Sequence, residues 1–132
     1  MARATGSFEV KLTPQSTDAE SGGSSLARLT IDKEFRGDLV ATSKGEMLSA
    51  GTQTKGSAGY VAQERVTGTL GGRRGSFVLQ HTGVMDRGKP ALVITVVPDS
   101  GTGDLANLSG TMNIIIEAGK HSYEMDYEIA AS

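Results

Sequence analysis

The sequence predicts an all-β protein folded as a closed eight-stranded antiparallel meander β-barrel. Eighteen glycines stand among 132 residues beside many valines, isoleucines and threonines, a composition typical of short strands and turns. Apolar and polar residues alternate with a period of two in eight segments, and no segment keeps a helical period over three turns. Most connections are two to six residues long and contain Gly, Pro, Asn or Asp, so consecutive strands form hairpins.

The first strand is expected at 7–12, where Phe8, Val10 and Leu12 share one face. The polar, low-complexity residues 13–25 follow and predict a flexible surface loop. An open meander would expose its edge strands to aggregation, so we expect the sheet to close into one domain over 1–132. The other strands are expected at 26–35, 38–51, 59–70, 75–85, 90–97, 109–117 and 121–130.

The hairpin of the second and third strands has two candidate registers. A two-residue turn at Gly37-Asp38 would place Leu29 opposite Glu46, which mixes an apolar and a charged face. A three-residue loop instead places Leu29 opposite Gly45. We therefore expect that loop or a bulge.

The remaining hairpins have clearer registers. A turn in TQTK places Ser43 opposite Glu64, and the turn GGRR places Glu64 opposite His81. The turn DRGK then places His81 opposite Ile94, and a turn at Ala118-Gly119 places Met112 opposite Met125. Because opposed residues share a face, one apolar face propagates through these strands and should line the interior.

This inward face combines large and small side chains. Ser43, Gly45, Ala62, Gly83 and Gly110 lie on it and leave space beside aromatic and methionine side chains. An interior eight strands wide can hold one small ligand. The residues expected to line such a ligand cavity are Met47, Phe77, Leu79, Ile94, Met112, Tyr123, Met125 and Tyr127.

Glu64 and His81 are the candidate chemical groups, because they are the polar pair on this otherwise apolar face. Burial would raise the carboxyl pKa and a neighbouring carboxylate favours a protonated imidazole, so the pair could hold one proton near neutral pH. Tyr60, further along the strand, would add a hydroxyl that polarises a carbonyl or enolate. The alternatives are a polar pair that only joins two strands, and a three-residue turn that would oppose Glu64 to Gln80 or Thr82.

Composition argues against several other classes of site. The absence of cysteine excludes disulfides, thiolate nucleophiles and zinc–thiolate sites. Beyond Arg73-Arg74 there is no basic run to bind nucleic acid. The longest apolar run, 91–97, is too short to span a membrane, and the N-terminus lacks an apolar signal core. A cytoplasmic protein is the expectation.

Two further motifs are weak. The glycines in VVPDSGTGDLA (96–106) have the spacing of a dinucleotide fingerprint, but a strand is expected to follow where the fingerprint needs a helix. His81 and His121 with Glu64 or Glu46 are the bare minimum for a 2-His-1-carboxylate metal site. Neither a cofactor nor a metal is predicted.

The runs KGSAGYVAQERVTGTLGGRRGSFVLQHTG (55–83) and VVPDSGTGDLANLSGTM (96–112), with IDK at 31–33 and GEML at 45–48, resemble a bacterial domain-of-unknown-function family with the allene-oxide-cyclase-like barrel. The resemblance covers nearly the whole chain and implies an eight-stranded meander. Relatives with this barrel include plant allene oxide cyclases, dirigent proteins and bacterial cyclases, which bind an apolar substrate inside the barrel. The plant cyclase's catalytic set has no residue-by-residue match here, so the resemblance implies a fold and assigns no activity.

The leading expectation is therefore a barrel that binds a small, largely apolar molecule, with acid/base chemistry of isomerase, cyclase or lyase type at Glu64 and His81. The alternatives are a non-catalytic, lipocalin-like carrier or sensor and a structural barrel whose cavity is incidental. Val93 and Val97, on the outer face, predict an interface between copies of the chain.

Overall fold

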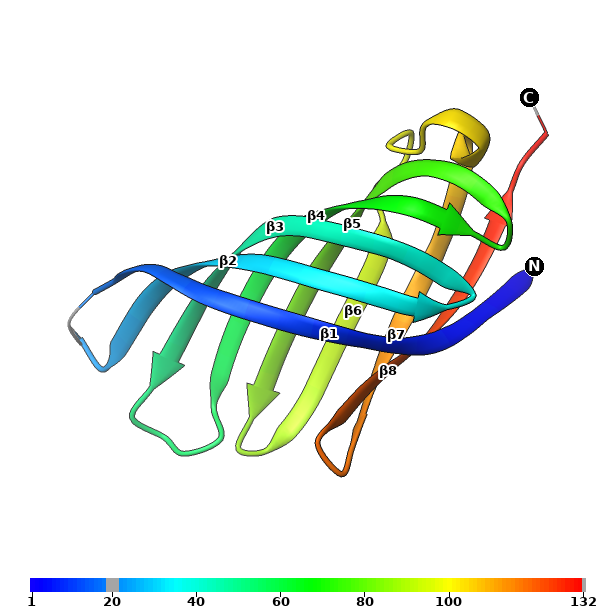
Figure 1. Ribbon diagram of the computed structural model, residues 1–132. Helices are drawn as coiled ribbons and strands as arrows, with labels where there is room; N and C mark the ends of the chain where they lie inside the picture. The colour runs from blue at the N-terminus through cyan, green and yellow to red at the C-terminus, as the bar shows by residue number, and fades with distance from the viewer. Residues whose placement is uncertain (19–21, 132) are drawn as a thin grey trace.

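A computed structural model describes residues 1–18 and 22–131, and its architecture is all-β. Eight antiparallel strands follow one another in chain order and close into a barrel, because β1 pairs with both β2 and β8 (Figure 1). The predicted closed eight-stranded meander is thus confirmed. The strands are β1 (Ala2–Thr17), β2 (Ser24–Gly37), β3 (Leu39–Thr52), β4 (Ala58–Leu70), β5 (Arg73–Asp86), β6 (Lys89–Val96), β7 (Leu108–Glu117) and β8 (Lys120–Ile129), and a 3-10 turn, η1 (Gly103–Leu105), precedes β7.

The seam between β1 and β8 closes the barrel. Its ladder joins residues 2–8 of β1 to residues 121–127 of β8. On the outer face, Arg3 donates from Nε to Asp126 Oδ1 at 2.8 Å and from Nη2 to Oδ2 at 3.2 Å. The planar guanidinium matches the carboxylate in this bidentate geometry, and the pair joins two residues that the ladder places directly opposite each other.

Two hairpins have the predicted register. In the β5–β6 hairpin His81 lies opposite Ile94, and in the β7–β8 hairpin Met112 lies opposite Met125. Each turns on two residues with positive φ. This is the type I′ geometry, whose twist matches that of the flanking strands.

The β4–β5 hairpin has a different register from the predicted one. It turns on residues 71–72, two glycines with φ of 56° and 84°, which is one position earlier than expected. Glu64 therefore lies opposite Leu79, and His81 lies opposite Ala62. The displacement is two residues, which is the side-chain period of a strand, so every side chain keeps its predicted face.

The β2–β3 and β3–β4 hairpins are displaced in the same way. Leu29 lies opposite Met47, and Ser43 lies opposite Val66. The β3–β4 connection is longer than the expected four-residue turn, since Gly51 and Ala58 form the last pair of the ladder. Each ladder is displaced from the predicted one by two residues, so the inward face is unchanged.

The flexible loop predicted at 13–25 is wrong for most of its length. β1 continues to Thr17 and β2 begins at Ser24, so both strands extend beyond the expected limits. The ladder shifts by one residue just after Pro14, a residue that cannot donate a backbone hydrogen bond. The part of the prediction that falls on 19–21 lies outside the described residues.

The segment after β6 closes one end of the barrel. Residues 97–107 fold over β5, where the Thr102 amide donates to the Ser76 carbonyl at 2.8 Å and the Ser76 amide donates to Thr102 Oγ1 at 3.1 Å. Leu105 of η1 is fully buried beneath them. Gly75 permits this close approach, because a Cβ there would lie 2.0 Å from the Thr102 carbonyl oxygen. Figure 1 shows η1 at the end of the barrel that also carries both termini.

The opposite end is open to solvent. The β3–β4, β5–β6 and β7–β8 turns lie there (Figure 1), and inward-facing side chains become more exposed toward them. Along β5 the exposed fraction rises from 3% at His81 to 43% at Met85, and along β6 it rises from 1% at Ile94 to 38% at Leu92. We call this part of the interior the open half. Its inward side chains, none of them fully buried, are Val10, Leu29, Met47, Tyr60, Leu92, Ile114 and His121.

The hydrophobic core fills the rest of the interior. Phe35, Phe77, Leu79, Tyr123 and Met125 are among its fully buried members, and they come from three strands around the barrel, β2, β5 and β8. Burial of these side chains is the main force that holds the strands together. In the part of the chain that the structure describes, no helix is long and apolar enough to cross a membrane.

Candidate functional site

Glu64 lies in the middle of β4 and points into the barrel, where it is 1% exposed. The strand alternation that buries Ala62 and Val66 places Glu64 on the same face. Gly45 lies opposite on β3, and a Cβ there would lie 2.8 Å from the Glu64 Cβ. The glycine therefore provides the space that the glutamate side chain occupies.

Three side chains from three other strands surround the Glu64 carboxylate. Lys33 Nζ of β2 donates to Oε2 at 2.8 Å, and Ser43 Oγ of β3 donates to Oε1 at 2.7 Å. His81 Nε2 of β5 lies 2.5 Å from Oε2. The exposed fractions of Lys33, Ser43 and His81 are below 9%, so the four residues form a buried polar cluster at the inner limit of the open half.

Glu64 and His81 meet as predicted, but as diagonal neighbours instead of a directly opposed pair. His81 lies opposite Ala62, so its ring must reach diagonally to the next inward position of β4 to contact Glu64. Such diagonal pairs remain within reach of long side chains. The contact therefore survives a register that differs from the predicted one.

Tyr60 extends the cluster toward the open end. Its hydroxyl lies 3.3 Å from His81 Nδ1, and the two ring centroids are 6.1 Å apart. Gly83 lies opposite Tyr60 on β5, and a Cβ there would lie 2.5 Å from Tyr60 Cε1. The tyrosine ring thus occupies the space above a residue that has no side chain.

The charges of the cluster fix its protonation state. Burial by itself raises the Glu64 pKa, but the hydrogen bond to His81 and the charge of Lys33 outweigh burial and lower the pKa to about 2. Glu64 is therefore the ionised member of the pair near neutral pH. A carboxylate can only accept, so His81 Nε2 carries a hydrogen and donates to Glu64. In a neutral ring Nδ1 is then the acceptor, and the Tyr60 hydroxyl donates to it.

The Tyr60 phenol is held in its neutral form. Burial raises its pKa above the ordinary value, and the negative charge of Glu64 raises it further. A neutral phenol can donate one hydrogen bond and accept others. Tyr60 is also only half-buried, so it is the member of the chain of hydrogen bonds that lies nearest to solvent.

Lys33 was missed in the sequence. Its ammonium group lies 5.0 Å from the Phe8 ring centroid and 5.7 Å from the Phe35 ring centroid, within the range of cation–π attraction. The signal was present, because Lys33 lies between the inward residues Ile31 and Phe35 in strict alternation. A lysine in that position needs an internal partner, which Glu64 supplies.

The residues expected to line a ligand cavity are mostly deep in the core. Those in the hydrophobic cluster are 3% exposed or less, whereas Tyr127 packs against the cluster and Met47 lies half-buried in the open half. A role for them in ligand binding stays a prediction. The cluster members are Phe77, Leu79, Ile94, Met112, Tyr123 and Met125.

Of the residues weighed for a metal site, Glu64 and His81 are in contact, but His121 and Glu46 do not form a ligand group with them. His121 packs on the Phe8 ring with centroids 5.2 Å apart, and Glu46 faces outward, where it pairs with Arg28. Among the described residues there is no group of three His, Asp or Glu side chains that could hold a metal ion. The glycine-rich segment 96–106 contains η1, a 3-10 turn of three residues, and β7 follows it.

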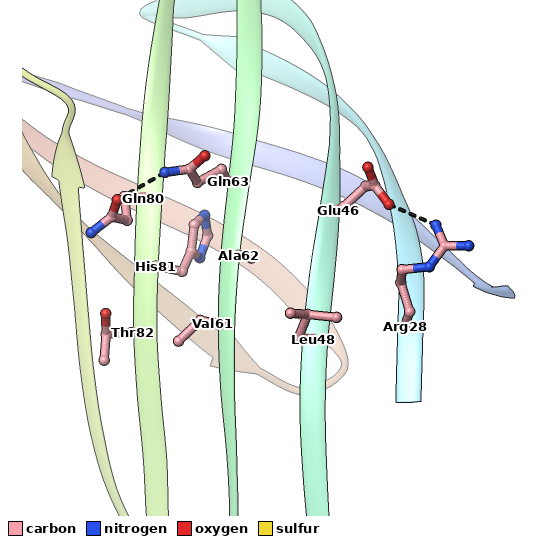
Figure 2. A pocket seen from close by; sticks show the side chains of 9 residues that line it. All are labelled: Arg28, Glu46, Leu48, Val61, Ala62, Gln63, Gln80, His81 and Thr82. Atoms are coloured by element: carbon pink, nitrogen blue, oxygen red, sulfur yellow. Dashed lines mark hydrogen bonds and ion pairs between the residues drawn. The ribbon is translucent and has the colours of Figure 1, made fainter. Parts of the chain in front are cut away.

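A groove of about 630 Å³ lies on the outer face of β2–β5 (Figure 2). Two polar bridges cross it. Gln63 Nε2 donates to Gln80 Oε1 at 2.9 Å, and Arg28 Nη1 donates to Glu46 Oε1 at 2.7 Å. These four side chains lie on the outer face. Ala62 and His81 also line the groove, so it adjoins the buried polar cluster at His81.

Apolar side chains also lie exposed on this outer face. Val93 is 61% exposed, whereas Val97, just after β6, is half-buried. An interface between copies of the chain at this face stays a prediction. The other exposed apolar residues nearby are Leu26, Leu48, Val61 and Val84.

The arrangement forms a chain of hydrogen bonds from a buried ion pair to a half-buried hydroxyl. Lys33 neutralises Glu64, Glu64 orients His81, and His81 accepts a hydrogen bond from Tyr60. Imidazole is the side-chain type whose ordinary pKa lies nearest to neutral pH. Chemically, this arrangement can accept a proton through Tyr60 and return it by the same route.

Comparison with known proteins identifies relatives of this chain. A family model described as "Protein of unknown function (DUF3224)" matches residues 4–127. A crystal structure of a protein with unknown function from the DUF3224 family of Shewanella oneidensis MR-1 is 53% identical to this chain. It covers 100% of this chain and 99% of its own, with a TM-score of 0.96. No curated protein matches.

Proposed function

The chain belongs to the DUF3224 family, and from that premise we propose that its barrel binds a small, largely apolar molecule in the open half and transfers a proton to or from it. In this proposal Tyr60 contacts the bound molecule, and His81 accepts and returns the proton through the tyrosine hydroxyl. Glu64 and Lys33 position and neutralise the imidazole. The reaction class is an isomerisation, cyclisation or elimination that needs no cofactor.

The observation that carries the proposal is the position of the cluster at the inner limit of the open half. The side chains around the entrance are largely apolar, and Val10, Met47 and Ile114 come from three different strands. Apolar walls with a few convergent polar groups are typical of small-molecule sites. A hydrogen-bonded chain that ends at such a place favours proton transfer over a purely structural role.

The role of Glu64 differs from the one expected from the sequence. With a pKa of about 2 it remains ionised throughout the physiological range. It therefore holds His81 in one tautomer, with Nε2 as the donor, and stabilises the imidazolium that forms when His81 accepts a proton. The proton itself moves between His81 Nδ1 and the Tyr60 oxygen.

The proposal can be tested with 2-tetralone, a small and largely apolar ketone with acidic α-hydrogens. In deuterated buffer, the wild-type protein should accelerate deuterium incorporation at the α-carbon. Tyr60→Phe should reduce that acceleration roughly a hundredfold, since general acid–base groups typically contribute at least that much. Mass spectrometry of the recovered ketone measures the exchange.

Tyr127→Phe is the matched control, because Tyr127 is also an inward, half-buried tyrosine but lies opposite Ala2 of β1, at the end of the barrel away from the open half. It should leave the exchange rate unchanged. NMR shifts of the Met47 and Ile114 methyl groups report binding separately. Binding without exchange would identify a non-catalytic carrier and overturn the chemistry. Absence of shifts at these methyl groups would overturn the whole proposal.

A further inference from the structure

We infer that the molecule bound in the open half carries one anionic oxygen group, such as a carboxylate, and that its binding is coupled to the uptake of one proton by His81. This inference rests on the proposed function, because it names the class of molecule that the same site takes. It also gives Lys33 a role beyond the stability of the fold.

The first step is the charge of the interior. Among the described inward-facing residues, five charged or titratable side chains lie in the open half or at its inner limit. Tyr60 on β4 and His121 on β8 lie in the open half, and Lys33 on β2, Glu64 on β4 and His81 on β5 lie at its inner limit. Neutral side chains face the same space from β1, β3, β6 and β7. The lysine and the glutamate cancel each other as a 2.8 Å ion pair. Any proton added to His81 therefore gives the site an uncompensated positive charge.

The second step is the direction of the hydrogen bonds. While His81 is neutral, the Tyr60 hydroxyl donates to Nδ1 and its hydrogen points away from the open half. When His81 gains a proton, Nδ1 becomes a donor and the Tyr60 oxygen becomes its acceptor. The phenol hydrogen is then free to turn toward the open half. Protonation of His81 thus creates a hydrogen-bond donor where a bound molecule would lie.

The third step joins the two. An anionic oxygen accepts the Tyr60 hydrogen, and its charge balances the imidazolium behind the tyrosine. Charge-assisted hydrogen bonds of this kind are stronger than neutral ones, more so in a site shielded from water. A neutral molecule gains neither the charge-assisted hydrogen bond nor the balance of charge. The site therefore favours an acid over an alcohol of the same shape, and takes up a proton from solvent as the acid binds.

Lys33 makes this coupling necessary. Without its charge, Glu64 would itself balance a protonated His81, and the site would be neutral before any molecule arrived. The Lys33 ammonium lies 2.8 Å from Glu64 Oε2 and already balances the charge of the carboxylate. The negative charge that balances a protonated His81 must therefore come from the bound molecule. One N–H of the Lys33 ammonium donates to Glu64, and the rings of Phe8 and Phe35 lie beside the ammonium.

The test compares 2-naphthoate with 2-naphthylmethanol, which share one apolar ring system. Isothermal titration calorimetry at pH 8, in HEPES and in Tris, gives the number of protons exchanged from the difference in observed enthalpy. Wild-type protein should take up about one proton per naphthoate and none per naphthylmethanol. It should bind the acid at least about tenfold more tightly than the alcohol.

Two variants locate the effect. Tyr60→Phe removes the donor, so it should lower naphthoate affinity about tenfold and leave naphthylmethanol affinity unchanged. Lys33→Met should abolish proton uptake, because Glu64 then balances His81 alone. Lys44→Met, an exposed lysine on the outer face, is the control for charge and should retain both effects. If Lys33→Met does not fold, the affinities of Tyr60→Phe for naphthoate and naphthylmethanol still test the inference.

The outcomes separate this inference from the proposed function. If both compounds bind equally and no proton is taken up, the inference is wrong while binding of an apolar molecule stands. If neither compound binds, the proposed function fails as well. Tighter binding of the acid with no proton uptake would also overturn the coupling to His81, since the charge would then be balanced elsewhere.

Discussion

Glu64 is the residue on which the properties of the site depend most. It is the buried carboxylate of the described residues, and it accepts hydrogen bonds from three different strands. A buried charge that lost these partners would be strongly destabilising. The same group therefore orients the imidazole and holds β2, β3 and β5 around β4.

The depressed pKa of Glu64 predicts how stability depends on pH. Its ordinary value is 4.5 and its value in the fold is about 2. Because each pKa unit corresponds to about 1.4 kcal/mol, the ionised form contributes on the order of 3 kcal/mol to the free energy of unfolding. A lowered folded-state pKa means that this contribution is complete above about pH 4.5 and is lost as the pH falls toward 2.

Urea denaturation at pH 5.5 and pH 2.5 measures this loss. The wild-type free energy of unfolding should fall by about 2–3 kcal/mol more than that of Glu64→Gln over this range. Glu9→Gln, an exposed member of a surface ion pair, should behave like the wild type. Equal pH dependence in the wild type and Glu64→Gln would show that Glu64 is not the responsible group.

At the scale of strands and turns, the hairpins show what the sequence could and could not predict. The face of each strand was predictable, because alternation has a period of two and survives a displacement of two residues. The β4–β5 register was wrong although a local signal existed. A type I′ turn needs positive φ at both central residues, which Gly71 and Gly72 supply and Arg73 does not.

The partners of Glu64 were less predictable than its burial. Lys33 and Ser43 reach it from β2 and β3, and their distances depend on the stagger of the whole barrel. Each hairpin register must be correct before such diagonal contacts can be placed. Alternation alone nevertheless puts Lys33 on the inward face, so its need for an internal partner could have been inferred.

The pairing of Gly83 with Tyr60 gives a prediction for the β4–β5 hairpin. A Cβ at position 83 would lie 2.5 Å from Tyr60 Cε1. Gly83→Ala should therefore displace the tyrosine ring from His81 and lower the free energy of unfolding by about 1–2 kcal/mol. The 2-tetralone exchange rate should fall as it does in Tyr60→Phe.

Gly51→Ala is the matched substitution, since the nearest atom to its added Cβ is 3.5 Å away. Both glycines lie in strands and neither has a strained φ. A normal exchange rate in Gly83→Ala would contradict the claim that the tyrosine position above Gly83 matters for proton transfer. Thermal denaturation of the two variants separates displacement of the ring from loss of the fold.

At the scale of the whole molecule, the barrel has one closed end, one open end and one weak seam. In the described structure, β6 and β7 pair only at Ile94 with Met112 and at Thr95 with Thr111. By contrast, the β1–β8 ladder joins residues 2–8 to residues 121–127. Toward the open end, residues 89–92 and 114–117 lie beyond the β6–β7 ladder.

Hydrogen exchange followed by NMR should reveal this asymmetry. Amides in 89–92 and 114–117 that face across the β6–β7 seam have no strand partner there, so they should exchange by local opening at least tenfold faster than amides of the closed end. A molecule bound in the open half would contact Leu92 and Ile114 on either side of the seam. Adding 2-naphthoate should therefore slow exchange at these segments and leave the β1–β8 seam unchanged. Uniform protection around the barrel, or slowing at the β1–β8 seam instead, would place the entrance elsewhere.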